Sequence, residues 1–510
     1  MINDDVKKIN VLVSTATPDR CSKEVLSYFK QELNINKLYV VTGDWSEFDE
    51  YSQFDGCICQ HDCRVGAYER YYDKYVDEYL AVDEKILNSY AQYMPELMHQ
   101  MCRDEDPYRY QIDKSYMGRH RLAMNHLRFW YNFLLNNDID YYLLLDSPHT
   151  AFDYAIYNLC KVIKTKSICV INDVLHARRY FVAKDLDEFG EIFKSAEKKV
   201  NELLESGIEL KLSDDLEAEL QEMSSGKAEN MQAVIRGYSD TTTKITLRAY
   251  YGYSSFWDYL QFIFGYSYSR YIKKCSKFKA VIKTVRVAVP SAIEGLKRAN
   301  IKYSRSVYKK TLKFFEEYDA VAVEADYDCK YVYYAFQYLP ENSSNPLGGR
   351  LYADQSVPIS IISAAIPDDW KVYVKVHPAQ LGVVCTAEMM KDLLSIPKVV
   401  LVNRNTPTLE LTRHAQAVSA LTGHVSWEAQ FMDVPALVFG ITDLRYAPMS
   451  YYVRTNEECR QAINDIMVNP RKTNVEEIRK FLLVHDYYTF YFDKQKVVEG
   501  IKRVLEEYEK

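Results

Sequence analysis

The stretch from residue 372 to residue 440 reads VYVKVHP at 372–378, VVLVNRN at 399–405 and HAQAVSALTGHVSWEAQFMDVPALVFG at 414–440. Short runs rich in β-branched residues each end at a polar or basic group, and helical patterns lie between them. This alternation of short strands with helices predicts a parallel α/β sheet. Ligands of such sheets bind beyond the carboxyl ends of the strands, so the residues that follow each run are candidates for a binding site.

Two basic residues and one acid stand at these strand ends. Lys375 and His377 close the first run, and Glu428 lies in the first turn of a predicted helix. A histidine N–H can donate to a phosphate oxygen, a lysine adds positive charge, and a helix start favours an anion. A carboxylate can accept hydrogen bonds from two ribose hydroxyls. We therefore predict a phosphorylated-nucleotide site, to which the turn residues Thr422, Gly423, His424 and Ser426 contribute phosphate or nucleobase contacts.

The alternative interpretation of these residues needs no ligand. His377 would then be a histidine at the end of a strand, and Glu428 a helix-start acid stabilised by the helix dipole.

Length and composition are those of a folded, two-domain protein. The chain has 510 residues, too many for one hydrophobic core, with 48% hydrophobic and 26% charged residues. No apolar run is long enough to span a membrane, and the first ten residues lack the apolar core of a signal peptide. The eleven cysteines are scattered and odd in number, which favours reduced thiols in the cytoplasm.

Strand and helix patterns divide the chain into four parts. Residues 1–180 are expected to form an α/β domain, with strands near 8–16, 38–44, 54–60, 140–146 and 167–173 and helices over 68–135. Residues 181–318 are expected to hold an acidic helical insertion followed by an aromatic and basic segment. Residues 319–485 should form a second α/β domain, and residues 486–510 a C-terminal helix.

The aromatic and basic segment suggests contact with a membrane surface. Residues 250–271 contain eleven aromatic side chains, and residues 270–313 contain fourteen Lys or Arg against one acid, Glu294. Aromatic residues beside a basic run are typical of proteins that rest on anionic lipid. The alternative is a buried tyrosine-rich face beside solvated lysines. We do not expect nucleic acid to be a partner.

Several common sites are absent from the sequence. There is no P-loop and no G-x-G-x-x-G pattern, so neither a Walker nucleotide site nor a dinucleotide site is supported. The chain also has no clear D-x-D pattern of the kind that binds a metal ion in GT-A glycosyltransferases. We accordingly expect no metal ion and no cofactor.

Motifs in both halves resemble the surface-carbohydrate and capsular-polysaccharide biosynthesis glycosyltransferases. The second half carries YVYYAFQYLPE at 331–341, Asp354-Gln355, Pro367, VKVHP at 374–378 and TGHVSWEAQFMDVPALVFG at 422–440. The first half carries GRHRLAMNHLRFW at 118–130 and DSPHTAFDYAIYNLCK at 146–161. The resemblance implies a GT-B fold, in which two Rossmann-like domains face a central cleft. It places the nucleotide-sugar donor in the second domain and the acceptor in the first.

The same resemblance implies that Gln337, Glu341 and Gln355 face the cleft. By spacing alone they are equally consistent with the internal hydrogen bonds of a loop. Val376 stands where relatives often have Glu, and His424 where they usually have a small residue.

Two residues of the first half are candidates for the base that deprotonates an acceptor hydroxyl. Asp146 and His149 follow the apolar run YYLLL, and either a histidine or a desolvated carboxylate can accept such a proton. The alternative for Ser147-Pro148-His149 is a turn that leads into the next helix.

The sequence thus predicts a metal-independent GT-B glycosyltransferase. It would transfer a sugar from a nucleotide-sugar donor, such as a CMP-linked acidic sugar resembling CMP-Kdo, to a bacterial surface polysaccharide or lipid-linked glycan. It would be cytoplasmic and peripheral on the inner face of the cell membrane. The alternatives are a polyol-phosphate transferase that uses CDP-glycerol, and a non-catalytic membrane-bound scaffold with the GT-B fold.

Overall fold

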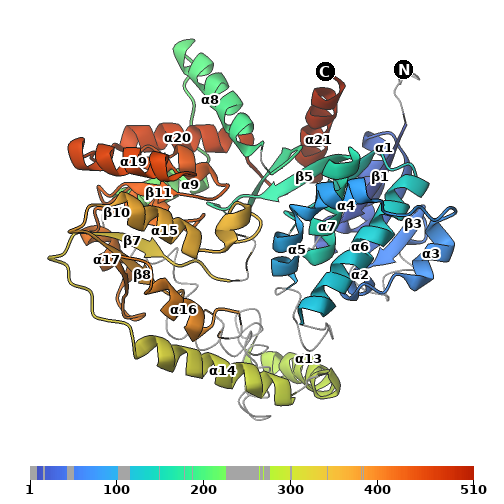
Figure 1. Cartoon of the computed structure of the whole chain (residues 1–510). Helices are drawn as coiled ribbons and strands as arrows, with labels where there is room; N and C mark the ends of the chain where they lie inside the picture. The colour runs from blue at the N-terminus through green and yellow to red at the C-terminus, as the bar shows by residue number, and fades with distance from the viewer. Residues whose placement is uncertain are drawn as a thin grey trace.

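The computed structural model shows two α/β domains joined by helices (Figure 1). It describes residues 8–14, 18–42, 51–101, 115–148, 150–176, 178–186, 188–225, 264, 268, 276–298, 301–339, 341, 343–378, 380, 382 and 384–510.

The first domain is built on a sheet with strand order β13-β6-β5-β4-β1-β2-β3. Strands β1 (Ile9–Ser14), β2 (Ile35–Thr42), β3 (Gly56–Cys59), β4 (Tyr141–Leu144) and β5 (Lys166–Asn172) are parallel, while β6 (Arg179–Ala183) and β13 (Phe490–Tyr491) are antiparallel to their neighbours. From β1 the chain adds strands first on one side and then on the other, so the strand order reverses between β1 and β4.

Helices cover both faces of this sheet. The helices on the first part of the chain are α1 (Lys23–Glu32), α2 (Gln60–Val65), α3 (Glu69–Tyr75), α4 (Glu84–Ala91), α5 (Met94–Gln100), α6 (Tyr116–Asn136) and α7 (Ala151–Ile163). Successive β1 side chains point to opposite faces. Leu12 packs in the core beneath α6 and α7, whereas Val11 and Val13 pack in the core beneath α1.

The C-terminal segment returns to the first domain. After α20 (Val475–Tyr488), β13 pairs with β6, and α21 (Lys494–Glu509) packs against β6 and α1. The apolar side of α21 drives this return, because Val497, Val498, Ile501 and Val504 are all buried in the core shared with β1 and α1. Residues 486–510 therefore supply a strand and a helix to the first domain.

The domain boundary that we expected after residue 180 falls within β6. The first residues of the expected acidic insertion therefore belong to the first sheet. The helices of the insertion are α8 (Phe189–Glu205) and α9 (Asp214–Ser224). Both pack against α20, and α8 projects from the top of the molecule in Figure 1. The insertion is thus tied to the segment that crosses between the domains.

The aromatic and basic segment is described in part. Its residues 250–271 lie outside the described residues apart from Phe264 and Tyr268. The basic part forms α13 (Lys277–Arg298) and the start of α14 (Ile301–Asp319), which lie below both domains in Figure 1. Among the described residues, no helix combines the length and the apolarity that a membrane crossing requires.

The second domain contains a parallel sheet with strand order β12-β11-β10-β7-β8-β9. The strands are β7 (Tyr331–Ala335), β8 (Lys371–Lys375), β9 (Val399–Leu401), β10 (Ala417–Ala420), β11 (Ala436–Val438) and β12 (Ser450–Tyr452). Its helices include α15 (Ser356–Ala365), α16 (Ala387–Leu393), α17 (Thr408–His414), α18 (Val425–Ala429) and α19 (Asn456–Val468), with a short 3-10 helix η5 (Asp443–Tyr446). The strand order reverses between β7 and β10.

The predicted fold class is confirmed: two Rossmann-like α/β domains face each other, with helical insertions between them. Residues 320–325, at the start of the second domain, form only one bridge, between Val323 and Val402.

Candidate functional site

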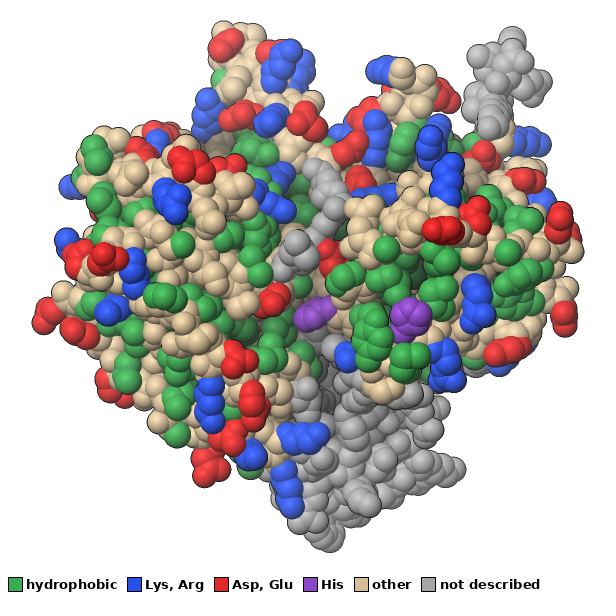
Figure 2. Space-filling view, viewed as in Figure 1, with side chains coloured by type: hydrophobic (Ala, Val, Ile, Leu, Met, Phe, Trp, Pro, Cys, Tyr) green, Lys and Arg blue, Asp and Glu red, His purple; other side chains and the backbone are tan. Residues whose placement is uncertain are grey.

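A cleft of about 480 Å³ lies between the two domains, a size that suits a small-molecule ligand. In the space-filling view the domains form two lobes with a furrow between them (Figure 2). The cleft is at the carboxyl ends of β7, β8 and β10, where the strand order of the second domain reverses. This is the place where parallel sheets bind ligands. The predicted residues that line it are Gln337, Glu341, Lys375, His377, Thr422, Gly423, His424 and Glu428.

Lys375 supplies a buried positive charge to the cleft wall. Its Nζ donates to the carbonyl of Thr406 over 2.8 Å and to Oγ1 of Thr408 over 2.6 Å. Burial lowers the pKa of Lys375 to about 8, against the opposing effect of the Glu428 carboxylate. A bound anion would offset that desolvation by interacting with the ammonium group.

His377 follows Lys375 by two residues, beyond the end of β8. Its ring lies 5.6 Å from the ring of Tyr338, centroid to centroid. Burial, together with the nearby Lys375 charge, lowers the pKa of His377 to about 4. The imidazole is therefore neutral at pH 7 and can act as a hydrogen-bond donor to a ligand through one ring nitrogen.

Glu428 is a buried acid with an unused oxygen. The residue is 4% exposed, and its Oε2 has no hydrogen-bond partner. Burial raises the pKa of Glu428 to about 8, although Lys375 acts in the opposite direction. Buried polar atoms in folded proteins are normally paired. An unpaired carboxylate oxygen in a cleft wall is therefore suited to accept a hydrogen bond from a ligand hydroxyl.

Hydrogen bonds fix the shape of the cleft floor. The Gln355 Oε1 accepts from the backbone N–H of Gln337 over 2.7 Å, and Gln355 Nε2 donates to the Gln337 carbonyl over 2.8 Å. The side chain of Gln337 in turn bonds to Thr422, whose Oγ1 donates to the Ser343 carbonyl over 2.8 Å. Gln355 itself is 2% exposed and lies behind the cleft. These amides position the loops around the cleft.

The turn before α18 joins the second domain to the first. His424 Nε2 lies 3.2 Å from the carbonyl of Leu175, and Trp427 Nε1 donates to Glu219 over 2.9 Å. Ser426 is buried, does not line the cleft, and has an Oγ without a hydrogen-bond partner. Because α18 spans only five residues, its dipole is a minor source of anion binding. Lys375 is therefore the main positive charge among the described residues that line the cleft.

The first domain contributes Asn172, Asp173 and Val174, at the end of β5, to the opposite wall of the cleft.

The two candidate bases of the first domain are not among the described residues that line the cleft. Asp146 follows β4, and its Oδ2 lies 3.2 Å from Nη1 of Arg20. His149 lies outside the described residues. Thr150 forms a capping box with Asp153 at the start of α7, as expected for a turn leading into a helix.

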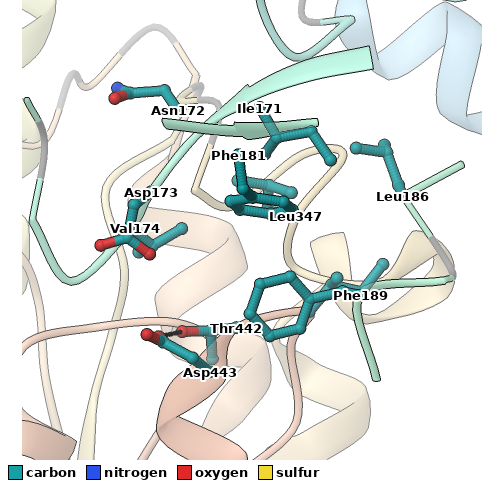
Figure 3. A pocket seen from close by; sticks show the side chains of 11 residues that line it. Ile171, Asn172, Asp173, Val174, Phe181, Leu186, Phe189, Leu347, Thr442 and Asp443 are labelled. Carbon is teal, nitrogen blue, oxygen red and sulfur yellow. Dashed lines mark hydrogen bonds between the residues drawn. The ribbon is translucent and has the colours of Figure 1, made fainter. Parts of the chain in front are cut away.

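Sequence reasoning missed a group of titratable side chains beside the cleft. Asp173, His176, Asp443 and His485 come from both domains and from α20, and we call them the interdomain cluster. Figure 3 shows Asp173 and Asp443 on the same side of a small adjoining cavity. The end of the run SICVIND was a signal for Asp173, because a carboxylate there follows a strand. No local pattern indicated the other three.

No model of a known protein family and no curated protein sequence matches the chain. Among solved structures, a UDP-GlcNAc 2-epimerase from Methanocaldococcus jannaschii is similar over 98% of this chain and 100% of its own, with 10% identity and a TM-score of 0.25. A UDP-GlcNAc 2-epimerase from Neisseria meningitidis, bound to UDP-GlcNAc, covers 97% of this chain and 100% of its own, with 11% identity and a TM-score of 0.25.

A third solved structure is a β-Kdo 2,7 transferase from Thermosulfurimonas dismutans. It matches 39% of this chain and 62% of its own, with 13% identity and a TM-score of 0.21. TM-scores this low do not establish a common fold, so the fold assignment rests on the strand orders of the two sheets.

Proposed function

We propose that this protein is a glycosyltransferase that takes a nucleotide-sugar as donor. The observation that carries the proposal is the placement of Lys375, His377 and Glu428 on one wall of an interdomain cleft, at the point where the strand order reverses. A cation and a neutral imidazole suit a diphosphate or phosphodiester, and an acceptor oxygen suits ribose hydroxyls. The second domain would hold the donor and the first domain the acceptor.

The acceptor is proposed to be a bacterial surface polysaccharide or a lipid-linked glycan. An inverting transfer needs a base that removes the proton of the acceptor hydroxyl as the sugar–phosphate bond breaks. His149 and Asp146 remain the candidates for that base. The nucleotide leaves with its phosphate held by Lys375 and His377, so no metal ion is required in this step.

A thermal-shift panel of CMP, CDP, UDP and GDP tests the donor site. A ligand at a hundred times its dissociation constant stabilises a protein by about 2.7 kcal/mol, which raises the melting temperature measurably. We expect one nucleotide to stabilise the wild type and to lose this effect in His377→Ala. His414→Gln is the matched control, since His414 is an exposed histidine of the same domain.

The outcome also separates the rival functions. Preference for CMP supports a CMP-linked sugar donor, whereas preference for CDP favours a polyol-phosphate transferase. Stabilisation by none of the four nucleotides would contradict a donor site and leave the non-catalytic scaffold.

We also propose that α13 rests on an anionic membrane surface. Its described part exposes an apolar stripe at helical spacing: Phe278 (76% exposed), Val281 (49%), Ile282 (41%), Val285 (46%) and Val289 (40%). The basic residues Lys277, Lys279, Lys283 and Arg286 are interspersed with the stripe along the same helix. An exposed apolar face with flanking cations suits the lipid headgroup boundary. This position would place the protein at the inner face of the cell membrane.

Vesicle flotation tests this contact. With phosphatidylglycerol vesicles at low salt we expect the wild type to float, and the double variant Phe278→Ser/Ile282→Ser to remain with the soluble fraction. Val468→Ser is the control, because Val468 is 73% exposed on α19, in the second domain. Equal behaviour of the wild type and the double variant would contradict the proposal.

A further inference from the structure

The interdomain cluster brings four side chains, two aspartates and two histidines, to one buried place. Asp173 follows β5 of the first domain, Asp443 lies in η5 of the second, and His485 lies on α20, which crosses between them. His485 Nε2 is 3.2 Å from Asp173 Oδ2 and 3.3 Å from Asp443 Oδ2. His176 Nδ1 is 3.8 Å from the same oxygen of Asp173. The side chains of Asp173, Asp443 and His485 are at most 1% exposed.

His176 is oriented by a neighbouring acid. Its Nε2 lies 2.8 Å from Glu219 Oε2, so a proton on Nε2 is shared with that carboxylate. This leaves Nδ1 as the nitrogen with a free electron pair, and Nδ1 has no hydrogen-bond partner. Histidines that bind metal ions usually donate their other ring N–H to a carboxylate in this way.

His485 has an unsatisfied nitrogen in the centre of the cluster. Its ring is completely buried, and Nε2 makes no hydrogen bond of good geometry although two carboxylate oxygens are close to it. The ligand atoms of His485, Asp173 and His176 all lie within 4.8 Å of one another. The Nδ1 atom of His176, which has no hydrogen-bond partner, lies 3.8 Å from Oδ2 of Asp173.

We propose that Asp173, His176 and His485 bind a divalent metal ion of the zinc class, with Asp443 next to His485. Tetrahedral zinc with bonds of 2.0–2.1 Å places its ligand atoms about 3.3 Å from one another. The 3.2 Å between His485 Nε2 and Asp173 Oδ2 agrees with that value, and the 3.8 Å between His176 Nδ1 and the same oxygen requires a shift of His176. Two imidazoles and one carboxylate suit zinc better than calcium or magnesium, which prefer all-oxygen sites.

The ion would join the first domain to α20. Asp173 and His176 follow β5 and His485 lies on α20, so binding would tie the first domain to the segment that crosses from the second. Asp173 also lines the donor cleft, so the ion would stabilise one wall of it. The site is separate from the donor-binding residues, and it does not depend on the proposed glycosyl transfer.

Without an ion, Asp173, His176, Asp443 and His485 would form a buried ion-pair network. The two arrangements differ in metal content and in their response to chelators, which makes them separable by experiment.

The test uses the full-length protein purified without a metal-binding tag and dialysed against zinc. Elemental analysis should find about one zinc ion per chain, and EDTA should lower the melting temperature. His485→Gln and Asp173→Asn should lose the ion and the EDTA effect, whereas the exposed-site control His414→Gln should keep both. Glu219→Gln should weaken zinc binding by about 10- to 100-fold.

Visible spectroscopy on cobalt-substituted wild type provides a readout that does not depend on the variants folding. The intense absorption bands of four-coordinate cobalt are expected. Wild-type protein that holds no zinc after dialysis, or whose melting temperature EDTA leaves unchanged, would overturn the metal site in favour of the ion-pair network.

Discussion

Gln337 and Thr422 hold each other across the point where the strand order of the second domain reverses. Gln337 Nε2 donates to Thr422 Oγ1 over 2.7 Å, and the Thr422 backbone N–H donates to Gln337 Oε1 over 3.1 Å. One residue follows β7 and the other follows β10. The pair therefore closes the base of the cleft and sets the distance between the loops that carry the candidate donor-binding residues.

Replacing Gln337 by Ala should destabilise both the protein and its ligand complex. The change leaves the buried backbone N–H of Thr422 without its partner, which costs about 1–3 kcal/mol. Urea denaturation measures this loss, and titration with the stabilising nucleotide should show weaker binding. Gln461→Ala, at an exposed position of α19, is the control. For this variant we expect the free energy of unfolding to change by no more than about 0.5 kcal/mol.

Glu428→Gln should make the protein more stable at alkaline pH. In the folded protein the pKa of Glu428 is raised to about 8 by burial, so the folded state holds this proton more tightly than the unfolded state does. Wild-type stability attributable to this group is therefore complete at acid pH and is lost as the pH rises towards 8. The variant cannot ionise and escapes this loss.

Melting temperatures at intervals from pH 5 to pH 9 measure the effect. The advantage of Glu428→Gln over the wild type should grow up to about pH 8 and then level off. The exposed Glu24→Gln should show no such trend. An advantage for Glu428→Gln that is independent of pH would mean that the carboxyl group is already ionised at pH 5.

Nucleotide affinity should fall as the pH rises above about 8. The pKa of Lys375 is lowered to about 8 by burial, and His377, with a pKa of about 4, carries no charge at neutral pH. The phosphate therefore depends on the Lys375 ammonium for its charge interaction, and this ammonium loses its proton in that range. Calorimetric titrations from pH 7 to pH 9.5 should show the decline in the wild type but not in Lys375→Met. Lys371→Met, at the opposite end of β8, should behave as the wild type does.

Turnover measurements on His149→Ala and Asp146→Asn should distinguish the two candidate bases. Removal of a general base lowers turnover by about 10²- to 10⁴-fold with little effect on donor binding. Since Asp146 is already paired with Arg20, we expect the larger loss of turnover in His149→Ala. A larger loss in Asp146→Asn, with donor affinity unchanged, would assign the base to Asp146 instead.

Several elements of the fold and the site were predictable because their signals are local. VYVKVHP marks β8 and places Lys375 and His377 at its end, and the turn after ALTG leads into α18 with Glu428 in its first turn. A run of β-branched residues needs only its own periodicity to be identified as a buried strand. Since parallel strands share one edge for their carboxyl ends, these local signals also located the cleft.

Other strands were not predictable, because their pairing is decided by distant parts of the chain. β13 contains two residues, too few for any periodicity, and it exists because Phe490 lies opposite Tyr180.

The sequence by itself determined the parallel strands of the two sheets and most side chains of the candidate donor-binding wall, since both follow from patterns a few residues long. Only the tertiary structure decided the surroundings of those side chains. It buries Lys375 and Glu428 enough to shift their pKa values, and it uses Gln355 behind the cleft rather than in it. It alone brings His485 beside Asp173, because their contact depends on how α20 crosses between two folded domains.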